Sequence, residues 1–184
     1  MIFVHPVLAT VLVLGFAIFV FWRVGIDYAS RGSMSLISAV LQFFVFLLHA
    51  LSSYSYVDSR LSTVDKDSPL VPMAVALMGV GLVLTLAAMA QLRGATFGRV
   101  VSGLRESGVY RFTRNPQLVA YFVFLAGYAL LWPSWSGAAW LAVYCVIAHM
   151  MALTEERHLR RVFGAEYEAY CRRTPRYVGL PGDR

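Results

Sequence analysis

The sequence predicts an all-α, polytopic integral membrane protein with about five transmembrane helices and a C-terminal amphipathic helix. Two observations lead to this fold class. First, 59% of the 184 residues are apolar and only 14% are charged, whereas soluble domains are about 45–50% apolar and about 25% charged. The apolar excess must therefore face lipid. Second, five apolar stretches approach the roughly 20 helical residues that cross a bilayer.

The predicted spans are, in order, Ile2–Trp22, Met34–Tyr56, Leu70–Leu92, Leu118–Trp132 and Trp135–Leu153. Each is expected to be helical, because a helix satisfies its backbone polar groups internally when no water is present. Pro133 and Ser134 separate the fourth stretch from the fifth. This short separation predicts a tight turn and an antiparallel helix pair.

The basic residues predict the orientation. All of them except Arg60 and Lys66 fall on one side of the membrane if the N-terminus lies outside. Because Lys and Arg in short loops are retained on the cytoplasmic side, we expect an inner-membrane protein of bacterial type with a cytoplasmic C-terminus. The net charge of +6 then reflects attraction to anionic lipid, and no nucleic-acid partner is expected.

Beyond Thr154 the pattern changes from apolar to amphipathic. Leu159, Phe163, Tyr167 and Tyr170 recur at helical spacings with Arg and Glu between them. This period predicts an amphipathic helix. Two placements are open, since such a helix can lie on the membrane surface or pack as a lid over the ends of the spans.

Two polar clusters lie on the predicted cytoplasmic side. The first, Arg93–Pro116, contains several glycines and ends with Tyr110, Arg114, Asn115 and Pro116. Proline is favourable at a helix start, and the free N–H groups after it can bind an anion. A flexible basic loop that only caps a span would have the same composition.

The second cluster is Glu155 and Glu156, at the end of the fifth span. Adjacent carboxylates repel each other, so a nearby cation is expected. Arginines such as Arg157 and Arg160 could supply it, and so could a bound ammonium or sulfonium. His149 shares a helix face with Glu156 two turns earlier, either as a packing residue or as a base.

The other polar side chains are interpreted structurally. His49 and Gln42 lie seven residues apart in the second span, which favours helix packing. His5 and His158 are assigned to membrane boundaries. No spacing of His, Cys, Asp and Glu predicts a metal site.

Three segments in order carry a resemblance. They are GVYRFTRNPQLVA at 108–120, EERHL at 155–159, and FGAEYEAY at 163–170 followed by Arg173 and Pro175. Together they resemble the isoprenylcysteine carboxyl methyltransferase and phospholipid methyltransferase family, over roughly Gln91 to Pro175. The family pattern G-x-Y-x-x-x-R-H-P-x-Y-x-G is changed at three positions, where Asn115 replaces His, Leu118 replaces Tyr and Ala120 replaces Gly.

The resemblance implies that S-adenosylmethionine binds between the loop before the fourth span and the end of the fifth. It also implies a single membrane domain, 1–184, with three spans in 1–92 and a cofactor-binding catalytic part in 93–175. The implied cofactor-binding residues are Tyr110, Asn115, Pro116, Leu118, Glu155 and Glu156, and the catalytic candidates are Arg114, Arg173 and Glu156. Arg99, Arg173 and the tail helix would close over the site.

The expected function is S-adenosylmethionine-dependent methyl transfer to a lipophilic acceptor at the cytoplasmic membrane face. An isoprenylcysteine-like carboxylate, or another prenylated or small amphiphilic molecule, would be oriented by Arg114 or Arg173. A phospholipid amine is an alternative acceptor, and its deprotonation would give His149 or a glutamate a role. Further alternatives are an NADPH-dependent sterol-type reductase, which residues 170–175 also resemble, and a non-enzymatic membrane scaffold. The oligomeric state is open.

Overall fold

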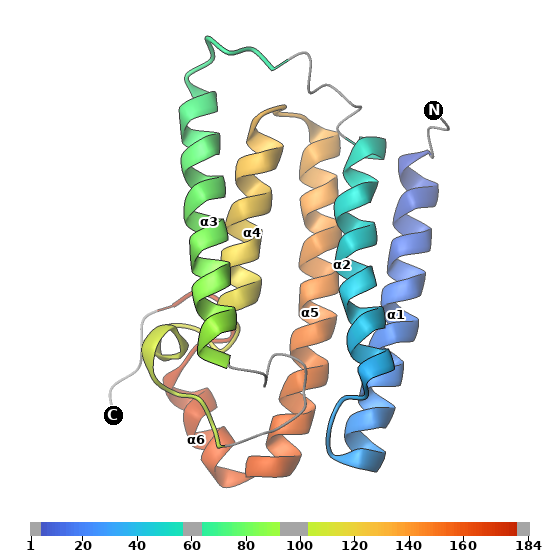
Figure 1. Ribbon diagram of the computed structural model, residues 1–184, viewed down its shortest axis with the longest axis vertical. Helices are drawn as coiled ribbons and strands as arrows, with labels where there is room; N and C mark the ends of the chain where they lie inside the picture. Colours follow the sequence, from blue (N-terminus) through green and yellow to red (C-terminus); the bar gives the residue numbers. More distant parts are fainter. Residues whose placement is uncertain (1–4, 57–63, 93–102, 180–184) are drawn as a thin grey trace.

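The described part of the chain is helical. The computed structural model describes residues 5–56, 64–92 and 103–179, and no strand occurs among them (Figure 1). The helices are α1 (Pro6–Arg31), α2 (Leu36–Tyr56), α3 (Leu70–Leu92), α4 (Pro116–Leu130), α5 (Trp135–Phe163) and α6 (Ala165–Arg173), with a short 3-10 helix, η3 (Gly108–Arg111), before α4. The predicted all-α class is confirmed.

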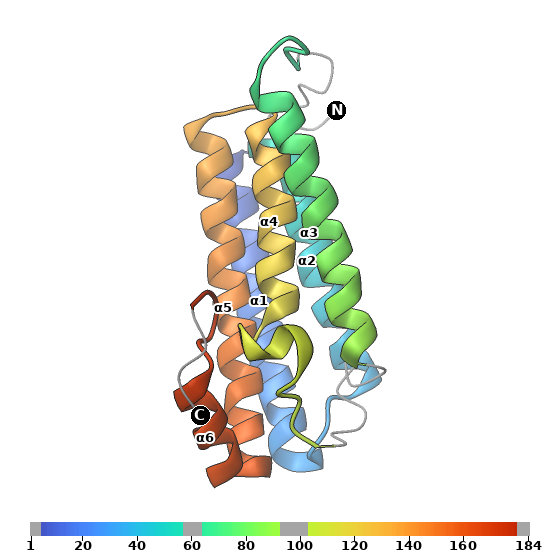
Figure 2. The ribbon, with the colours of Figure 1, turned by 90° about the vertical axis from the view of Figure 1, so that its left-hand side faces the viewer.

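Within the described residues, α1, α2, α3 and α5 are long and apolar enough to cross a membrane. The fourth predicted span, α4, has 15 residues and is about 22 Å long at 1.5 Å per residue. It lies beside α3 and runs antiparallel to α5 (Figures 1 and 2). The turn predicted at Pro133 and Ser134 joins the pair, and the Ser134 side chain caps α5 by accepting from Gly137 N at 3.1 Å.

Two helices continue beyond the spans predicted for them. α1 ends at Arg31 rather than near Trp22, and α5 ends at Phe163 rather than near Leu153. Each helix stops at a glycine with positive φ, Gly32 at 68° and Gly164 at 50°, a conformation that glycine adopts readily. Hydropathy marks the limits of the lipid, whereas these glycines set the limits of the helices.

The predicted C-terminal amphipathic stretch is divided by Gly164. Leu159 and Phe163 belong to the last turns of α5, whereas Tyr167 and Tyr170 belong to α6. Both tyrosines are buried, and α6 turns back beside the end of α5 (Figure 1). Of the two placements that the sequence left open, these contacts support a lid over the ends of the spans.

The helices pack in one continuous bundle. α3 packs closely on α4, α4 packs on α5, and α1 and α2 pack on each other and on α5. Glycines permit the first contact, since a Cβ at Gly81 would lie 2.8 Å from the Ala120 carbonyl oxygen and a Cβ at Gly127 would lie 2.7 Å from that of Ala74. One cavity is lined by residues from all six of the α-helices named above.

His49 joins α2 to α5, as the packing interpretation predicts. Its Nε2 lies 3.1 Å from the Trp140 carbonyl oxygen, and Trp140 Nε1 donates to the His49 carbonyl oxygen at 2.9 Å. The two rings also stack, with centroids 4.7 Å apart. Such reciprocal bonds between buried polar groups fix the register of two helices in lipid.

Candidate functional site

A buried carboxylate surrounded by arginines lies at the basic end of the bundle, the end that carries α6 and residues 103–115 (Figure 1). Glu156 is only 1% exposed. Arg176 binds it through two hydrogen bonds, of 2.7 and 2.9 Å, while Arg114 and Arg160 approach it to 3.0 and 3.6 Å. Burial alone would raise the pKa of Glu156, but the hydrogen bonds to Arg176 and the charge of Arg114 hold that pKa below its ordinary value. Glu156 is therefore ionised, and its charge is neutralised by the protein.

The same region ties the C-terminal tail to the start of α4. The Arg114 backbone N–H donates to the Pro175 carbonyl oxygen at 3.0 Å. The Thr113 hydroxyl and the Asn115 amide both donate to the Arg176 carbonyl oxygen, at 3.1 Å. Asn115 therefore holds the tail in place, and with it the arginine that binds Glu156.

Helix α6 packs against the segment before α4. The Tyr170 hydroxyl donates to the Tyr110 carbonyl oxygen at 2.7 Å, and Arg173 Nη2 lies 2.8 Å from Glu106 Oε2. Tyr110 and Tyr170 are both buried. These contacts close one side of the site.

A cavity of about 550 Å³ lies beside this cluster and extends between the helices. Its charged and aromatic lining residues include Arg105, Tyr110, Arg114, Glu155, His158, Tyr167 and Tyr170, and His158 is stacked on Tyr28. Its apolar lining residues include Met34, Ala39, Phe43, Phe46, Leu47, Ala50, Met89 and Met151, which come from the membrane-spanning helices and the segment before α2.

The structure brings the residues of the predicted site to one place but gives them different surroundings. Tyr110, Arg114, Leu118 and Glu155 line the cavity, whereas Asn115, Pro116, Glu156 and Arg173 are not among its lining residues. Pro116 is the first residue of α4 and is buried. Arg99 lies outside the described residues.

The structure shows the surroundings of Leu118 and Ala120, two residues that depart from the family pattern. Leu118 lines the cavity, and its carbonyl oxygen accepts from the Tyr144 hydroxyl at 2.7 Å. Tyr121, one turn further along α4, supplies an aromatic ring to the cavity wall. Ala120 is buried, and its carbonyl oxygen lies beside Gly81 where α3 packs on α4.

The surroundings of Glu155 differ from those of the adjacent Glu156. It lies past Leu153, where the apolar part of α5 ends, and it faces the cavity. Unlike Glu156, it forms no hydrogen bond or ion pair with a described residue. Burial raises the pKa of the Glu155 carboxyl to about 7, because loss of water disfavours the charged form. A bound cation would stabilise the ionised form.

His149, which the sequence offered as a possible base, lies outside the cavity that Glu155 lines. It is exposed, its Nδ1 lies 2.9 Å from the Tyr177 hydroxyl, and it is not a lining residue of the cavity. His158, assigned to a membrane boundary, is buried and lines the cavity instead. Its position three residues after Glu155, on the same helix face, was the available signal. Its stacking on Tyr28 could not be predicted, because Tyr28 lies far away in the sequence.

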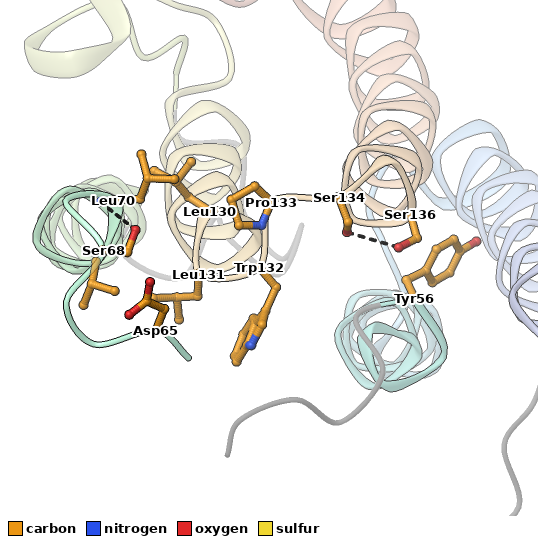
Figure 3. Close-up of a pocket in the computed structure, with 11 residues that line it drawn as sticks. Tyr56, Asp65, Ser68, Leu70, Leu130, Leu131, Trp132, Pro133, Ser134 and Ser136 are labelled. Carbon is orange, nitrogen blue, oxygen red and sulfur yellow. Dashed lines mark hydrogen bonds between the residues drawn. The ribbon is translucent and has the colours of Figure 1, made fainter. Parts of the chain in front are cut away.

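A second cavity, of about 500 Å³, lies at the opposite end of the bundle, between the residues before α3 and the turn that joins α4 to α5. Figure 3 shows that its serines are engaged locally, since Ser68 bonds the backbone of Leu70 and Ser134 bonds Ser136. Asp65, its acidic lining residue, is exposed. Ser68 and Ser134 bond backbone N–H groups at the starts of α3 and α5, and the candidate catalytic residues lie at the basic end.

Comparisons with known proteins agree with this location. No curated protein and no solved structure matches the chain. Residues 70–166 match the family model described as phospholipid methyltransferase, and they run from the first residue of α3 into α6. The match covers more than half of the 184 residues and includes the α4–α5 pair with both glutamates. The chain therefore belongs to the phospholipid methyltransferase family of integral membrane methyltransferases.

Proposed function

We propose that this protein transfers the methyl group of S-adenosylmethionine to a lipophilic acceptor at the basic end of the bundle. The observation that carries the proposal is the cavity, whose lining combines a carboxylate that pairs with no described residue and apolar side chains of the membrane-spanning helices. A water-soluble cationic cofactor and an amphiphilic acceptor need these two environments in contact. Membership of a membrane methyltransferase family supports the reaction class.

The charged and aromatic lining residues of the cavity suit this cofactor. Glu155 offers a negative charge to an ammonium or a sulfonium, and Tyr110 and Tyr170 offer rings against which an adenine can pack. S-adenosylmethionine supplies a methyl group on a positively charged sulfur. We assign Glu155 to binding of the cofactor's positive charge.

Glu156 receives a different role in this proposal. Its contacts with Arg114, Arg160 and Arg176 support a positioning role, in which it fixes the arginines and the tail rather than touching the cofactor. Arg173, paired with Glu106, would fix α6 in the same way. Asn115 and Pro116 would set the start of α4 and the path of the tail.

The chain's main tasks are then alignment and exclusion of water. Holding donor and acceptor in line supplies roughly 7–11 kcal/mol of the barrier in well-oriented reactions. The lid formed by α6, and the tail bonded to Thr113 and Asn115, would keep bulk water from the reacting atoms. We further propose that residues 93–175 are the catalytic part and that the basic end faces the cytoplasm across a bacterial inner membrane.

Two rival functions have specific supports. Residues 170–175 resemble part of the sterol-type reductases, and Arg105 and Arg114 in the cavity lining are side chains of the kind that bind the phosphates of NADPH. A scaffold without activity is favoured by the changes at Leu118 and Ala120. Both residues nevertheless fit the packing around the cavity.

Cofactor titration of the detergent-purified protein separates the three functions, because a ligand that binds only the folded state must stabilise it. We expect saturable binding of S-adenosylmethionine, measured as heat and as a thermal shift, and no saturable binding of NADPH. Binding of NADPH alone would replace the proposal with the reductase. Binding of neither ligand by a folded sample would favour the scaffold.

A further inference from the structure

Gln42 is a polar side chain of α2 whose amide is only weakly engaged by the protein. It is 9% exposed and lines the cavity. Its Nε2 donates to Met151 Sδ at 3.8 Å, and a thioether sulfur is a weak acceptor. Apart from this contact, the amide forms no hydrogen bond with a described residue. Most of its hydrogen-bonding capacity is therefore available to a ligand in the cavity.

His49 shows how the bundle engages a polar side chain that serves packing. It lies seven residues after Gln42, on the same face of α2. Its Nε2 lies 3.1 Å from the Trp140 carbonyl oxygen, and Trp140 Nε1 donates back to its backbone carbonyl at 2.9 Å. The sequence predicts helix packing for both residues. The structure confirms this role for His49, whereas packing leaves the Gln42 amide largely unused.

The part of the cavity around Gln42 is apolar. Ala39, Phe43 and Phe46 of α2 line it. Phe43 and Met89 of α3 are lining residues that are also 63% and 40% exposed, so the cavity is open between α2 and α3. Lipid chains at this opening cannot hydrogen-bond to an amide. A polar group carried in by an amphiphilic ligand can do so.

Gln42 lies farther from the basic end than the carboxylate that we assign to the cofactor. Met151, which it contacts, precedes Glu155 by four residues of α5. Four residues separate the two backbones by about 6 Å along the helix. An amphiphile whose head reacts near Glu155 would place at Gln42 the junction between that head and its aliphatic chain. Ester and amide linkages at such a junction present a carbonyl oxygen, which accepts from an amide N–H.

Family membership does not account for Gln42. The family match covers residues 70–166, and α2 (Leu36–Tyr56) lies before it. The unused amide is therefore a feature of this chain's own α2.

We propose that Gln42 is a specificity-determining residue, which donates an amide N–H to a carbonyl oxygen of the methyl acceptor at the junction between its reacting head and its aliphatic chain. The inference rests on the proposed function and adds to it a feature of the acceptor outside the reacting group. An acceptor with an ether at this junction offers a weaker hydrogen-bond acceptor and binds less tightly.

The test compares two lipids that differ in this carbonyl. Glycerol monolaurate has an ester, and 1-O-dodecylglycerol has an ether at the same position. Both have an uncharged glycerol head, so their difference does not depend on Arg105, Arg114 or Glu155. Calorimetry in dodecyl maltoside micelles measures the Kd of each lipid. We expect the unmodified protein to bind the ester about fivefold more tightly, which equals about 1 kcal/mol.

The matched variants remove one polar group each from the cavity lining. Gln42→Met replaces the amide by an unbranched apolar side chain, and the ester preference should fall below twofold. Gln42→Leu should give the same result with a branched side chain. The control is Thr85→Val, because the Thr85 hydroxyl also belongs to a lining residue but already donates to the Gly81 carbonyl oxygen at 2.7 Å. This control should keep the fivefold preference, and denaturant unfolding checks that every variant is folded.

The outcomes separate the inference from the proposed function. An ester preference below twofold in the unmodified protein would overturn the inference. A preference that persists in folded Gln42→Met would also overturn it and would indicate that an ordered water completes the amide. Equal loss in Thr85→Val would overturn the assignment to Gln42. S-adenosylmethionine is titrated into the same samples, and an intact ester preference without cofactor binding would overturn the proposed function instead.

Discussion

The contrast between the adjacent carboxylates Glu155 and Glu156 gives the sharpest prediction. Changing Glu156 to Gln removes a buried charge that binds Arg176 through two hydrogen bonds and also contacts Arg114 and Arg160. Removing one partner of a buried ion pair costs about 3–5 kcal/mol. The Arg176 and Arg160 side chains are 30% and 41% exposed, so water can rehydrate them, and we expect a loss of about 3 kcal/mol, at the lower limit.

Changing Glu155 to Gln has the opposite profile. No described residue loses a hydrogen bond or ion pair, and the raised pKa of Glu155 means that its ionised form destabilises the fold, so the free energy of unfolding at neutral pH should rise rather than fall. Loss of the charge that faces the cofactor should weaken S-adenosylmethionine binding about tenfold, which equals about 1.4 kcal/mol. The two amides have nearly the same shape as the carboxylates they replace.

The assay pairs denaturant unfolding in detergent micelles with calorimetric titration of the cofactor. Glu156→Gln should lose stability, and Glu155→Gln should lose affinity while being at least as stable as the unmodified protein. Equal losses of stability in both variants would refute the difference in their surroundings. Unchanged cofactor affinity in a folded Glu155→Gln variant would refute the assignment of the cavity-facing carboxylate.

Three further predictions follow from particular contacts. Because burial raises the pKa of Glu155 to about 7, it is protonated at lower pH; affinity for S-adenosylmethionine should therefore rise between about pH 6 and pH 7.5, and calorimetry of Glu155→Gln should show no such rise. Gly127→Ala would place a Cβ 2.7 Å from the Ala74 carbonyl oxygen, whereas a Cβ at Gly79 would meet nothing within 4 Å. Unfolding should thus show a loss of about 1–3 kcal/mol for Gly127→Ala and none for Gly79→Ala, and equal effects would contradict the α3–α4 packing. Tyr144→Phe removes only the hydroxyl that donates to the Leu118 carbonyl oxygen at 2.7 Å, and the free energy of unfolding should fall by about 0.6 kcal/mol, while the exposed Tyr54→Phe should have no effect.

The fold could largely be predicted from the sequence because lipid imposes a simple rule. Hydropathy identified the helices, and Pro133 with Ser134 identified the turn between α4 and α5. The ends of α1 and α5 could not be predicted in this way, since Gly32 and Gly164 stop these helices well beyond the apolar segments. Hydropathy gives no information about the part of a helix that extends beyond the lipid into water.

The site was predicted in part, for a different physical reason. Motif order placed Tyr110, Arg114 and Glu155 together, and all three line one cavity. The sequence could not distinguish Glu155 from Glu156, because which of two adjacent side chains turns toward the arginines depends on the rotation of α5. The role of Arg176 was also missed, since nothing near it in sequence reveals that Thr113 and Asn115 hold its carbonyl oxygen. His158 was missed because its stacking partner lies on α1.

Transfer of a labelled methyl group to lipid tests the central claim most directly. The protein is reconstituted in vesicles of total bacterial lipid and supplied with S-adenosylmethionine carrying tritium on its methyl group, and the lipid extract is counted. We predict time-dependent tritium in the lipid fraction for the unmodified protein, and at least a tenfold lower rate for Glu155→Gln at limiting cofactor. Saturable cofactor binding without tritium in any lipid, or equal labelling by the Glu155→Gln variant, would contradict the account.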